Sequence, residues 1–481
     1  MKALTTIGIT VNIAEEIFQR ASPDSVAVIE EDITHTYGDL ERLSRTVAEA
    51  LTAKLGTNKK ARIGLKGGDG LNYIALALGI LRSGSCFVPV ASELSPTEHE
   101  ALISTLVLDG EISFSEEGQD PLDFSYSPFE PISCGETGKW KEEFESLNPA
   151  LIRFSSGTTG ASKGILLSHE TLRRRVEAAN EGLQIGGGDR VLWVLSMAHH
   201  FAVSIILYLW NGAAVVIPSS HLAEDFLSAA NKHGVSVLYA SPFHYVLLAA
   251  AQSLPAWPSL RMAISTTAAL SREAAEGFAS AFGVYPGQAL GVMEVGLPFL
   301  NHPGSEEHPS SIGRPQPAFE VELRDSEGRQ VNNGSPGELF IKGPGMFDAY
   351  MAPWKPSAEI FSEGGWFSTG DIALADEQGY YYLKGRTHTV INVGGMKFFP
   401  EEVESLLCSQ PGITDARVMG LDHPTYGCVP VAEVIGSGEP KVSPLQLSML
   451  CRKHLARYKI PVEMRFVESI PRTPSGKIIR R

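Results

Sequence analysis

The feature that most constrains the fold is an alternation of helix-like segments with short β-branched runs. The segment HLAEDFLSAANKHG (221–234) has helical spacing, and the strand-like VSVLYAS (235–241) follows it directly. The same order recurs further on, where Ser271 is a predicted helix N-cap and Gly283 a predicted helix stop. Alternation of this kind predicts parallel strands joined by crossover helices, and therefore an α/β domain.

The chain is too long for one ordinary core, since it has 481 residues. After Gly385 the pattern changes to a helix, two long strands, a second helix and a final strand, which indicates a small α+β unit. We therefore expect a large multilayer N-terminal domain with mainly parallel sheets over residues 1–385 and a small α+β C-terminal domain over residues 386–481.

Charge and cysteine content exclude several classes of protein. The 55 acidic and 40 basic residues give a formal charge of -15, which disfavours nonspecific binding to nucleic acid or to anionic membranes. The five cysteines form no CxxC pair, which suits a reducing cytoplasm, and the N-terminus lacks a signal-peptide pattern. The uncharged segment 201–217 is too short for a membrane span, so we expect a buried helix, turn and strand there, and no integral membrane association.

A glycine- and hydroxyl-rich segment, FSSGTTGASKG (154–164), follows a short apolar run. Glycines allow main-chain N–H groups to converge on an anion, hydroxyls add donors, and Lys163 supplies a positive charge. This is not a Walker loop, because Gly164 rather than Ser or Thr follows the lysine. A hairpin without a ligand is the alternative.

The segment resembles the phosphate loop of the adenylate-forming superfamily, which includes acyl-CoA synthetases, firefly luciferase and nonribosomal peptide synthetase adenylation domains. Ser162 replaces the usual proline before the lysine. Further matches follow in the family's order along nearly the whole chain. The resemblance implies that ATP phosphates are bound by Ser155, Ser156, Gly157, Thr158, Thr159, Gly160 and Lys163.

The segment LGVMEV resembles the family motif whose glutamate binds Mg²⁺, which assigns Mg²⁺ binding to Glu294; a solvated loop carboxylate is the alternative. Leu290 stands in place of an aromatic residue near adenine, Gly291 matches the motif, and Met293 replaces a threonine that donates to phosphate. Loss of that hydrogen bond would cost about 1.5–3 kcal/mol of phosphate stabilisation.

Two further segments resemble nucleotide-binding motifs. Thr267 and Ala268 lie where family members line the adenine and acyl pockets with backbone, and an ordinary strand end is the alternative. Asp371, in the sequence GWFSTGD, corresponds to the carboxylate that accepts hydrogen bonds from the ribose hydroxyls, and Arg386 to an arginine that also reaches the ribose. A plain turn residue is the alternative for Asp371.

The C-terminal part resembles the family's mobile small domain. His388 occupies the hinge position, and Gly395 and Lys397 belong to a loop that lines the pantetheine tunnel during thioester formation. Lys477, in PRTPSGK, corresponds to the catalytic lysine that neutralises charge at the α-phosphate. A basic disordered tail running into Arg480 is the alternative.

The segment SMAHHF resembles the part of the family that lines the acyl pocket and gates the thiol, which implicates His199, His200 and Phe201, with His200 as the catalytic gate. Adjacent histidines rarely bind one metal ion together, so zinc is disfavoured. Amino-acid-activating members usually carry an aspartate here, and residues 199–204 contain none, which favours an acid without an amino group.

The resemblance implies ATP-dependent conversion of a small carboxylic acid to acyl-AMP with release of pyrophosphate, followed by transfer of the acyl group to the thiol of CoA. ATP, Mg²⁺ and CoA, or phosphopantetheine on a carrier protein, are the implied cofactors. Loading of an acyl or peptidyl carrier protein is the enzymatic alternative. A degenerate acyl-adenylate-binding protein is the alternative from another class.

Overall fold

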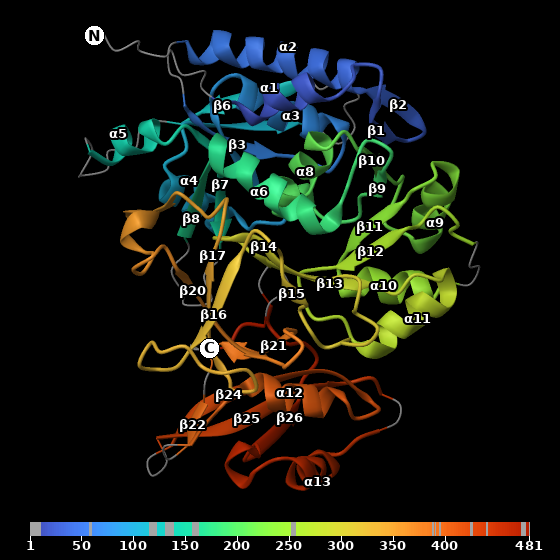
Figure 1. Ribbon diagram of the computed structural model, residues 1–481, viewed down its shortest axis with the longest axis vertical. Coiled ribbons are helices and arrows are strands. Elements are labelled where there is room, and N and C mark those ends of the chain that lie inside the picture. The colour runs from blue at the N-terminus through green and yellow to red at the C-terminus, as the bar shows by residue number, and fades with distance from the viewer. Residues whose placement is uncertain are drawn as a thin grey trace. The chain divides into compact units, whose positions relative to one another are not determined.

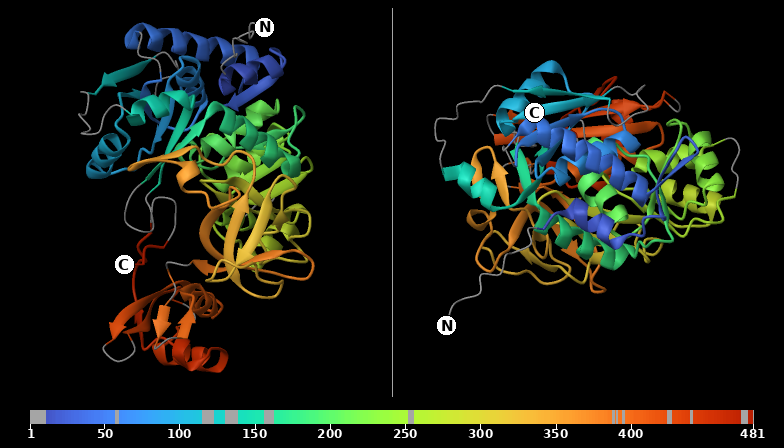
Figure 2. Two further views of the ribbon diagram at one scale, coloured as in Figure 1. Left: turned by 60° about the vertical axis from the view of Figure 1, so that its left-hand side comes forward. Right: turned by 90° about the horizontal axis from the view of Figure 1, so that it is seen from above.

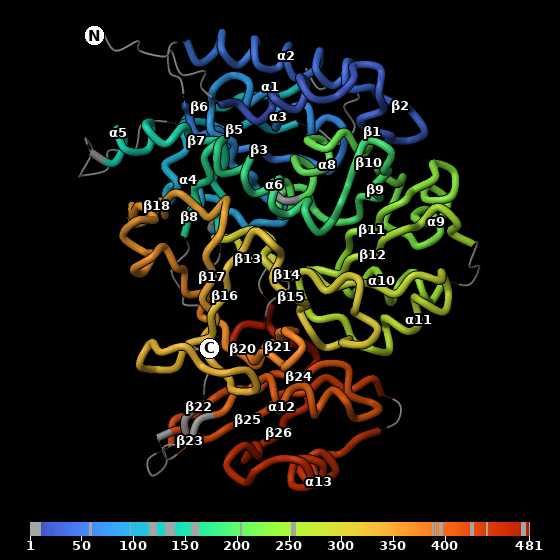
Figure 3. Tube along the Cα trace, viewed as in Figure 1, coloured from blue at the N-terminus to red at the C-terminus, as the bar shows by residue number. Residues whose placement is uncertain are grey.

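Two compact units make up the chain in the computed structural model. The first comprises residues 1–320 and 342–367, and the second comprises residues 321–341 and 368–481. These units are defined by packing, and the functional division at residue 385 stays a prediction. The residues that the structure describes, traced in Figure 3, are 11–56, 60–114, 123–129, 139–155, 163–251, 256–386, 389, 391–393, 396–423, 427–438, 441–472 and 478–480.

The first unit contains a nine-stranded sheet whose central strands are parallel. Its antiparallel pairs lie towards the two edges, where β2 pairs with β1 at one edge and β13, β14 and β15 pair in sequence at the other. The predicted parallel α/β architecture is therefore confirmed for this sheet. In spatial order its strands are β15 (Arg314–Pro315), β14 (Gly296–Asn301), β13 (Gly287–Val292), β12 (Met262–Ser265), β11 (Val237–Ala240), β9 (Arg190–Leu192), β10 (Ala214–Ile217), β1 (Val26–Glu30) and β2 (Ile33–Thr36).

An eight-stranded sheet in the same unit also has parallel central strands, with β3 between β4 and β5 and with β7 next to β4. The strands β8, β18 and β19 extend it as antiparallel neighbours at one edge, and β6 ends the other edge. In spatial order its strands are β19 (Trp354–Pro356), β18 (Ala349–Met351), β8 (Lys163–Ser168), β7 (Pro149–Ser155), β4 (Cys86–Val90), β3 (Arg62–Lys66), β5 (Gly110–Phe114) and β6 (Phe124–Pro128).

Helices cover the sheets of the first unit, and their ends follow the sequence signals. In α11, Ser271 accepts a hydrogen bond from Ala274 N at 3.2 Å, and Gly283 ends the helix in the left-handed region at φ 74°. Figure 1 and Figure 2 show α9, α10 and α11 beside β11 and β12, and α2 running along α3. The helices are α1 (Ile13–Arg20), α2 (Tyr37–Leu55), α3 (Leu71–Arg82), α4 (Pro96–Leu106), α5 (Lys139–Ser146), α6 (His169–Leu183), α7 (Met197–His200), α8 (Ile205–Trp210), α9 (Ala223–Lys232), α10 (Pro242–Ala249) and α11 (Arg272–Phe282), with 3-10 turns at Phe201–Val203 and Ser357–Glu359.

The uncharged segment 201–217 forms a 3-10 turn, the buried helix α8, a turn at Gly212 and strand β10, as its sequence predicts. Every residue of α8 is buried, which explains why this segment carries no charge. Within the described residues, no helix combines the length and the hydropathy that a membrane crossing requires.

The second unit holds three small sheets. A four-stranded sheet, nearly all of which belongs to this unit, is formed by β16 (Glu320–Arg324), β17 (Gly337–Lys342), β20 (Phe367–Ala375) and β21 (Tyr381–Arg386). The other elements are the hairpin β22 (Ile391–Val393) and β23 (Met396–Phe398), a sheet of β24 (Ile413–His423), β25 (Gly427–Gly436) and β26 (Glu463–Phe466), the helices α12 (Pro400–Cys408) and α13 (Pro444–His454), and a 3-10 turn at Arg457–Lys459.

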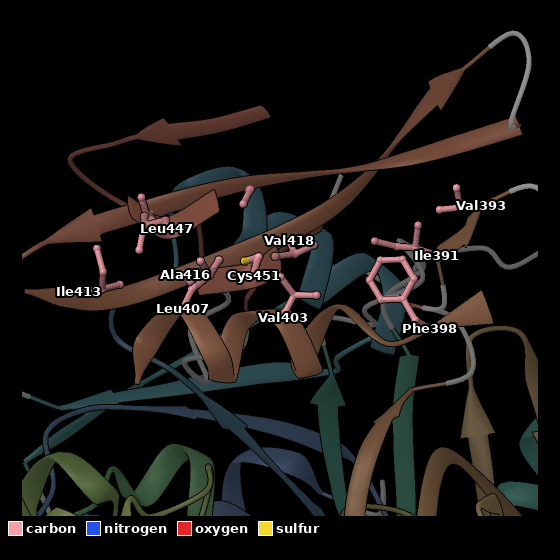
Figure 4. Close-up of a cluster of buried hydrophobic side chains, with 12 residues drawn as sticks. Ile391, Val393, Phe398, Val403, Leu407, Ile413, Ala416, Val418, Leu447 and Cys451 are labelled. Atoms are coloured by element: carbon pink, nitrogen blue, oxygen red, sulfur yellow. The ribbon is translucent and has the colours of Figure 1, made fainter. Parts of the chain in front are cut away.

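A compact apolar core joins α12 and α13 to the strands of this unit. Val403 and Leu407 point from α12 towards Ala416 and Val418 on β24, as Figure 4 shows, and all four are at most 1% exposed. The α+β prediction is thus confirmed. The second helix of this unit, α13, ends at His454, because Leu455 has an extended backbone.

Candidate functional site

The predicted phosphate loop connects two antiparallel strands of the first unit. Ser155 at the end of β7 lies opposite Lys163 at the start of β8. A strand rather than a helix follows Lys163, in agreement with the rejection of a Walker loop. The loop residues Ser156, Gly157, Thr158, Thr159 and Gly160, together with Ser162, lie outside the described residues, as does the side chain of Ser155.

Lys163 and Glu294, predicted as phosphate and metal ligands, meet on one aromatic side chain. The Lys163 Nζ lies 4.6 Å from the centroid of the Tyr350 ring, and Tyr350 Oη donates a 2.9 Å hydrogen bond to Glu294 Oε1. Tyr350 is brought there by strand pairing, since β18 runs beside β8 with Tyr350 opposite Ile165. One ring therefore holds a cation on its face and a carboxylate at its hydroxyl.

The backbone around Glu294 is fixed by a buried arginine from α6. Arg175 Nη1 donates to Met293 O at 2.9 Å, and its Nε donates to Gly345 O at 2.9 Å. Phe347 N donates to Glu294 O at 2.8 Å. Burial lowers the pKa of Arg175 to about 10, so it remains charged at neutral pH. Arg175 and Phe347 therefore hold the backbone of the turn that carries Glu294, and Tyr350 holds the Glu294 side chain.

The segments predicted to line the adenine pocket follow neighbouring parallel strands. Ser265 at the end of β12 lies opposite Gln288 on β13, so both strands lead to one edge of the sheet, where open α/β sheets bind ligands. Thr267 and Ala268 follow β12 and are exposed, and so is Gly291 at the end of β13. Leu290 is partly exposed on the same strand.

Thr267 adopts a backbone conformation that favours glycine. Its φ is 75°, which costs a β-branched residue about 1–2 kcal/mol relative to glycine. The family motif that this segment resembles has glycine at this position. Thr267 replaces that glycine and keeps a left-handed backbone.

The paired histidines end the short helix α7. His199 Nε2 lies 2.8 Å from Glu93 Oε1, and its Nδ1 lies 3.4 Å from Arg153 Nη2. Burial lowers the pKa of His199 and brings that of His200 to about 3, so His200 is neutral at physiological pH.

Phe201, predicted with these histidines as a pocket residue, belongs to an aromatic cluster of the core. It is 1% exposed, and its ring centroid lies 5.2 Å from that of Phe87 and 5.9 Å from that of Tyr73. Its contact with the acyl group stays a prediction.

The predicted ribose ligands are neighbours in the second unit. Asp371 on β20 lies opposite Arg386 on β21, and Asp371 Oδ1 lies 3.0 Å from Arg386 Nε. The Thr369 hydroxyl accepts a hydrogen bond from Asp371 N at 3.1 Å and donates to Leu339 O at 3.0 Å. Asp371 is 6% exposed, so this carboxylate is held in one orientation.

The hinge and loop residues are described only in part. His388 and Gly395 lie outside the described residues, and of Lys397 only the backbone is described, opposite Asn392 in the hairpin of β22 and β23.

The segment with the predicted catalytic lysine has a fixed stem. Lys477 lies outside the described residues, but Arg472 and Ile478 on either side of it form an antiparallel bridge. Beyond the bridge, Arg480 Nη2 lies 2.6 Å from Glu404 Oε2 and 3.2 Å from Glu401 Oε1, both on α12. The alternative of a disordered tail is wrong for Arg480, because two carboxylates bind it.

Sequence comparisons match both parts of the chain. The profile of the AMP-binding enzyme family matches residues 16–351, and that of the AMP-binding enzyme C-terminal domain matches residues 402–477. The chain belongs to the AMP-binding enzyme family. The superfamily predicted from the sequence motifs is thus confirmed.

Other AMP-binding enzymes align over much of the chain. A sulfoacetate–CoA ligase from Cupriavidus necator is 32% identical over 69% of this chain and 66% of its own length. The fatty acid–[acyl-carrier-protein] ligase ScoC from Streptomyces coeruleorubidus is 27% identical over 95% of this chain and 93% of its own. The family match, together with relatives that are named as CoA ligases or synthases, shows that the protein is an acid–thiol ligase.

The fold is that of solved AMP-binding enzymes. The ATP-bound MatB structure from Rhodopseudomonas palustris superposes with a TM-score of 0.85 at 21% identity, covering 98% of this chain and 97% of that chain. The predicted fold class is confirmed by this likeness.

Tyr350, Arg175 and Arg153 were not among the predicted site residues. Each acts on a site residue that is far away in the sequence, with separations of 56 residues for Tyr350 and Glu294 and 118 for Arg175 and Met293. A local sequence pattern does not reveal such contacts.

Proposed function

We propose that the enzyme converts a carboxylic acid without an α-amino group to acyl-AMP and then to its CoA thioester. The observation that carries this proposal is the Lys163–Tyr350–Glu294 arrangement beside the loop hairpin. It holds a cation and a carboxylate on one ring, and a nucleotide phosphate with its metal ion binds to groups of these two kinds.

Lys163 and the donors of the 156–160 loop bind the β- and γ-phosphates in this proposal, and Asp371 and Arg386 bind the ribose. Glu294 fits Mg²⁺, which is commonly held by one or two carboxylates and the substrate phosphates; when bound it would neutralise phosphate charge. The Tyr350 hydrogen bond is made to Oε1 and orients the carboxylate.

A carboxylate oxygen of the acid attacks the α-phosphorus in the first step, and the bond to the bridging oxygen breaks as pyrophosphate leaves. The carboxylate needs no general base because it is ionised at neutral pH. Lys477 neutralises the charge that develops on the α-phosphate oxygens. In the second step the thiol sulfur attacks the acyl carbon, AMP leaves with the electron pair of the acyl C–O bond, and the thiol proton passes to solvent.

The charges of the residues around His199 support a substrate without an amino group. Residues 199–204 contain no carboxylate, and Glu93, the carboxylate that reaches His199, is hydrogen-bonded to it. Arg153 on the other side of His199 would repel an ammonium group.

CoA is the proposed acceptor because several relatives at 25–32% identity are named as CoA ligases or synthases. ScoC, a relative named for an acyl carrier protein, keeps that acceptor as the second candidate.

Pyrophosphate release tests the proposal. The full chain is assayed with ATP, Mg²⁺ and a panel of acetate, propionate, malonate, succinate, sulfoacetate, ferulate and a fatty acid, each with CoA, with a phosphopantetheinylated carrier protein or with neither. Hydroxylamine trapping of the acyl-adenylate separates the first step from the second. ATP binding without turnover of any acid would show a degenerate binder instead.

A further inference from the structure

A partly buried arginine lies beside the predicted acyl segment and takes no part in the proposed chemistry. Arg153 is on β7, two residues before Ser155, and Lys163 lies opposite Ser155. At about 3.3 Å per residue, the Cα of Arg153 is about 7 Å along the strand from the start of the phosphate loop. Arg153 therefore lies near the start of the segment that binds the phosphates in the proposed function.

Arg153, His199 and His200 are all partly buried. Burial lowers the pKa of Arg153 to about 10 and that of His200 to about 3. All three residues nevertheless keep partial solvent contact, and the side chain of His199 is 21% exposed. These partly exposed side chains are therefore within reach of a small solute.

The charge of Arg153 is not neutralised by the described residues. Its hydrogen bond among them goes to His199 Nδ1, an acceptor without charge, and the proton on His199 Nε2 is directed to Glu93. The buried Tyr73 hydroxyl, which acts electrostatically on Arg153, has no hydrogen-bond partner among the described residues. A desolvated cation with neutral neighbours stabilises an incoming anion strongly.

We propose that Arg153 binds a second acidic group of the substrate, a carboxylate or a sulfonate, and that the enzyme activates short acids that carry two negative charges. The guanidinium offers two parallel N–H donors to such a group. The neutral imidazole of His199 holds the guanidinium in place through Nδ1. This inference rests on the proposed function and adds the substrate class to it.

Kinetics on the full chain test the inference. Pyrophosphate release is measured with propionate and with malonate, succinate and sulfoacetate. We expect the wild type to favour an acid with two charges at least 10-fold in kcat/KM over propionate. Arg153→Met should lower kcat/KM for that acid by 10- to 100-fold, mainly through KM, and leave propionate unchanged within twofold. Arg153→Lys should restore part of the loss.

Arg173→Met is the matched control, since Arg173 lies on α6 and pairs with Glu16 at 3.6 Å. Arg173→Met should leave kcat/KM unchanged both for propionate and for the acids with two charges. An equal loss for propionate and for the acids with two charges would show that Arg153 serves the reacting carboxylate, and the inference would be overturned.

Binding to the wild type gives a second test that needs no variant. Malonate, succinate or sulfoacetate should raise the melting temperature in the presence of a nonhydrolysable ATP analogue, and propionate at the same concentration should not. Shifts that are equal for propionate and the acids with two charges would contradict the inference. If these shifts appear but no acid releases pyrophosphate, the proposed reaction fails while the anion site stands.

Discussion

Tyr350 Oη donates a hydrogen bond of 2.9 Å to Glu294 Oε1, and the same ring receives Lys163 Nζ at 4.6 Å from its centroid. Burial raises the pKa of Tyr350, and the contact with Glu294 raises it further. The hydroxyl therefore keeps its proton and remains a donor. Tyr350 is thus a positioning residue for the proposed metal and phosphate ligands.

Removal of this hydroxyl should weaken the nucleotide site without unfolding it. We expect Tyr350→Phe to lower kcat/KM for ATP about 10-fold, as loss of a charge-assisted hydrogen bond of about 1.5 kcal/mol predicts, and to raise the Mg²⁺ concentration needed for half-maximal rate. Tyr350→Leu, which also removes the ring beneath Lys163, should lose a further factor of about three. Tyr382→Phe, which breaks a 3.1 Å hydrogen bond to Asp376, is the control. An unchanged Mg²⁺ dependence in Tyr350→Phe would refute the role.

The Asp371–Arg386 pair should set the affinity for the nucleoside. Asp371→Asn keeps the shape but loses the charge, leaving Arg386 without its carboxylate partner. We expect KM for ATP to rise 10- to 100-fold while the KM for the acid changes less than threefold. Asp376→Asn, in the same hairpin, should leave KM for ATP unchanged. The assignment fails if both variants behave alike.

The anchored stem around Lys477 should affect one half-reaction. Lys477→Ala removes about 4 kcal/mol of charge stabilisation, about three decades in adenylation rate, and should spare thioester formation from supplied acyl-adenylate. We expect Arg480→Gln, which frees the stem from Glu404 and Glu401, to slow adenylation about 10-fold and thioester formation less than twofold. The exposed Arg465→Gln is the control. If Arg480→Gln lowered the rates of both half-reactions equally, Arg480 would only stabilise the second unit, and its role in adenylation would be refuted.

Buried His169 should make stability depend on pH. It accepts a 3.1 Å hydrogen bond from Ile13 N at Nδ1, is 2% exposed, and burial lowers its pKa to about 4. The unfolded chain therefore binds more protons between pH 6.5 and 4, so stability is complete above pH 6.5 and declines as the pH falls towards 4. The loss amounts to about 3 kcal/mol.

Urea unfolding of the first unit, followed at several pH values, measures this decline. His169→Gln should be less stable at pH 7 and should show a flatter dependence on pH, whereas exposed His221→Gln should follow the wild type. A wild-type slope that persists in His169→Gln would assign the decline to other groups.

The sequence predicted those elements whose signals are local. Ser271 and Gly283 bound α11 as expected, and the alternation around α9 and β11 gives the parallel sheet. The motif residues Asp371 and Arg386 are adjacent because they lie opposite each other on the paired strands β20 and β21, and the motifs alone do not reveal this pairing.

The supporting residues could not be predicted from the sequence, because their partners come from other strands and helices. Tyr350 reaches Glu294 only after β18 pairs with β8, and Arg153 reaches His199 only after α7 packs near β7. The left-handed backbone of Thr267 was likewise unexpected, since β-branched residues rarely adopt it.

Arg175 ties α6 to two turns, one 118 and one 170 residues further along the chain. Because such non-local contacts form only after the intervening chain is ordered, we expect Glu294 to acquire its orientation late in folding. An intermediate with its sheets formed but this guanidinium undocked would be compact and yet unable to hold a metal–nucleotide complex, which makes nucleotide affinity a reporter of the last stage of maturation.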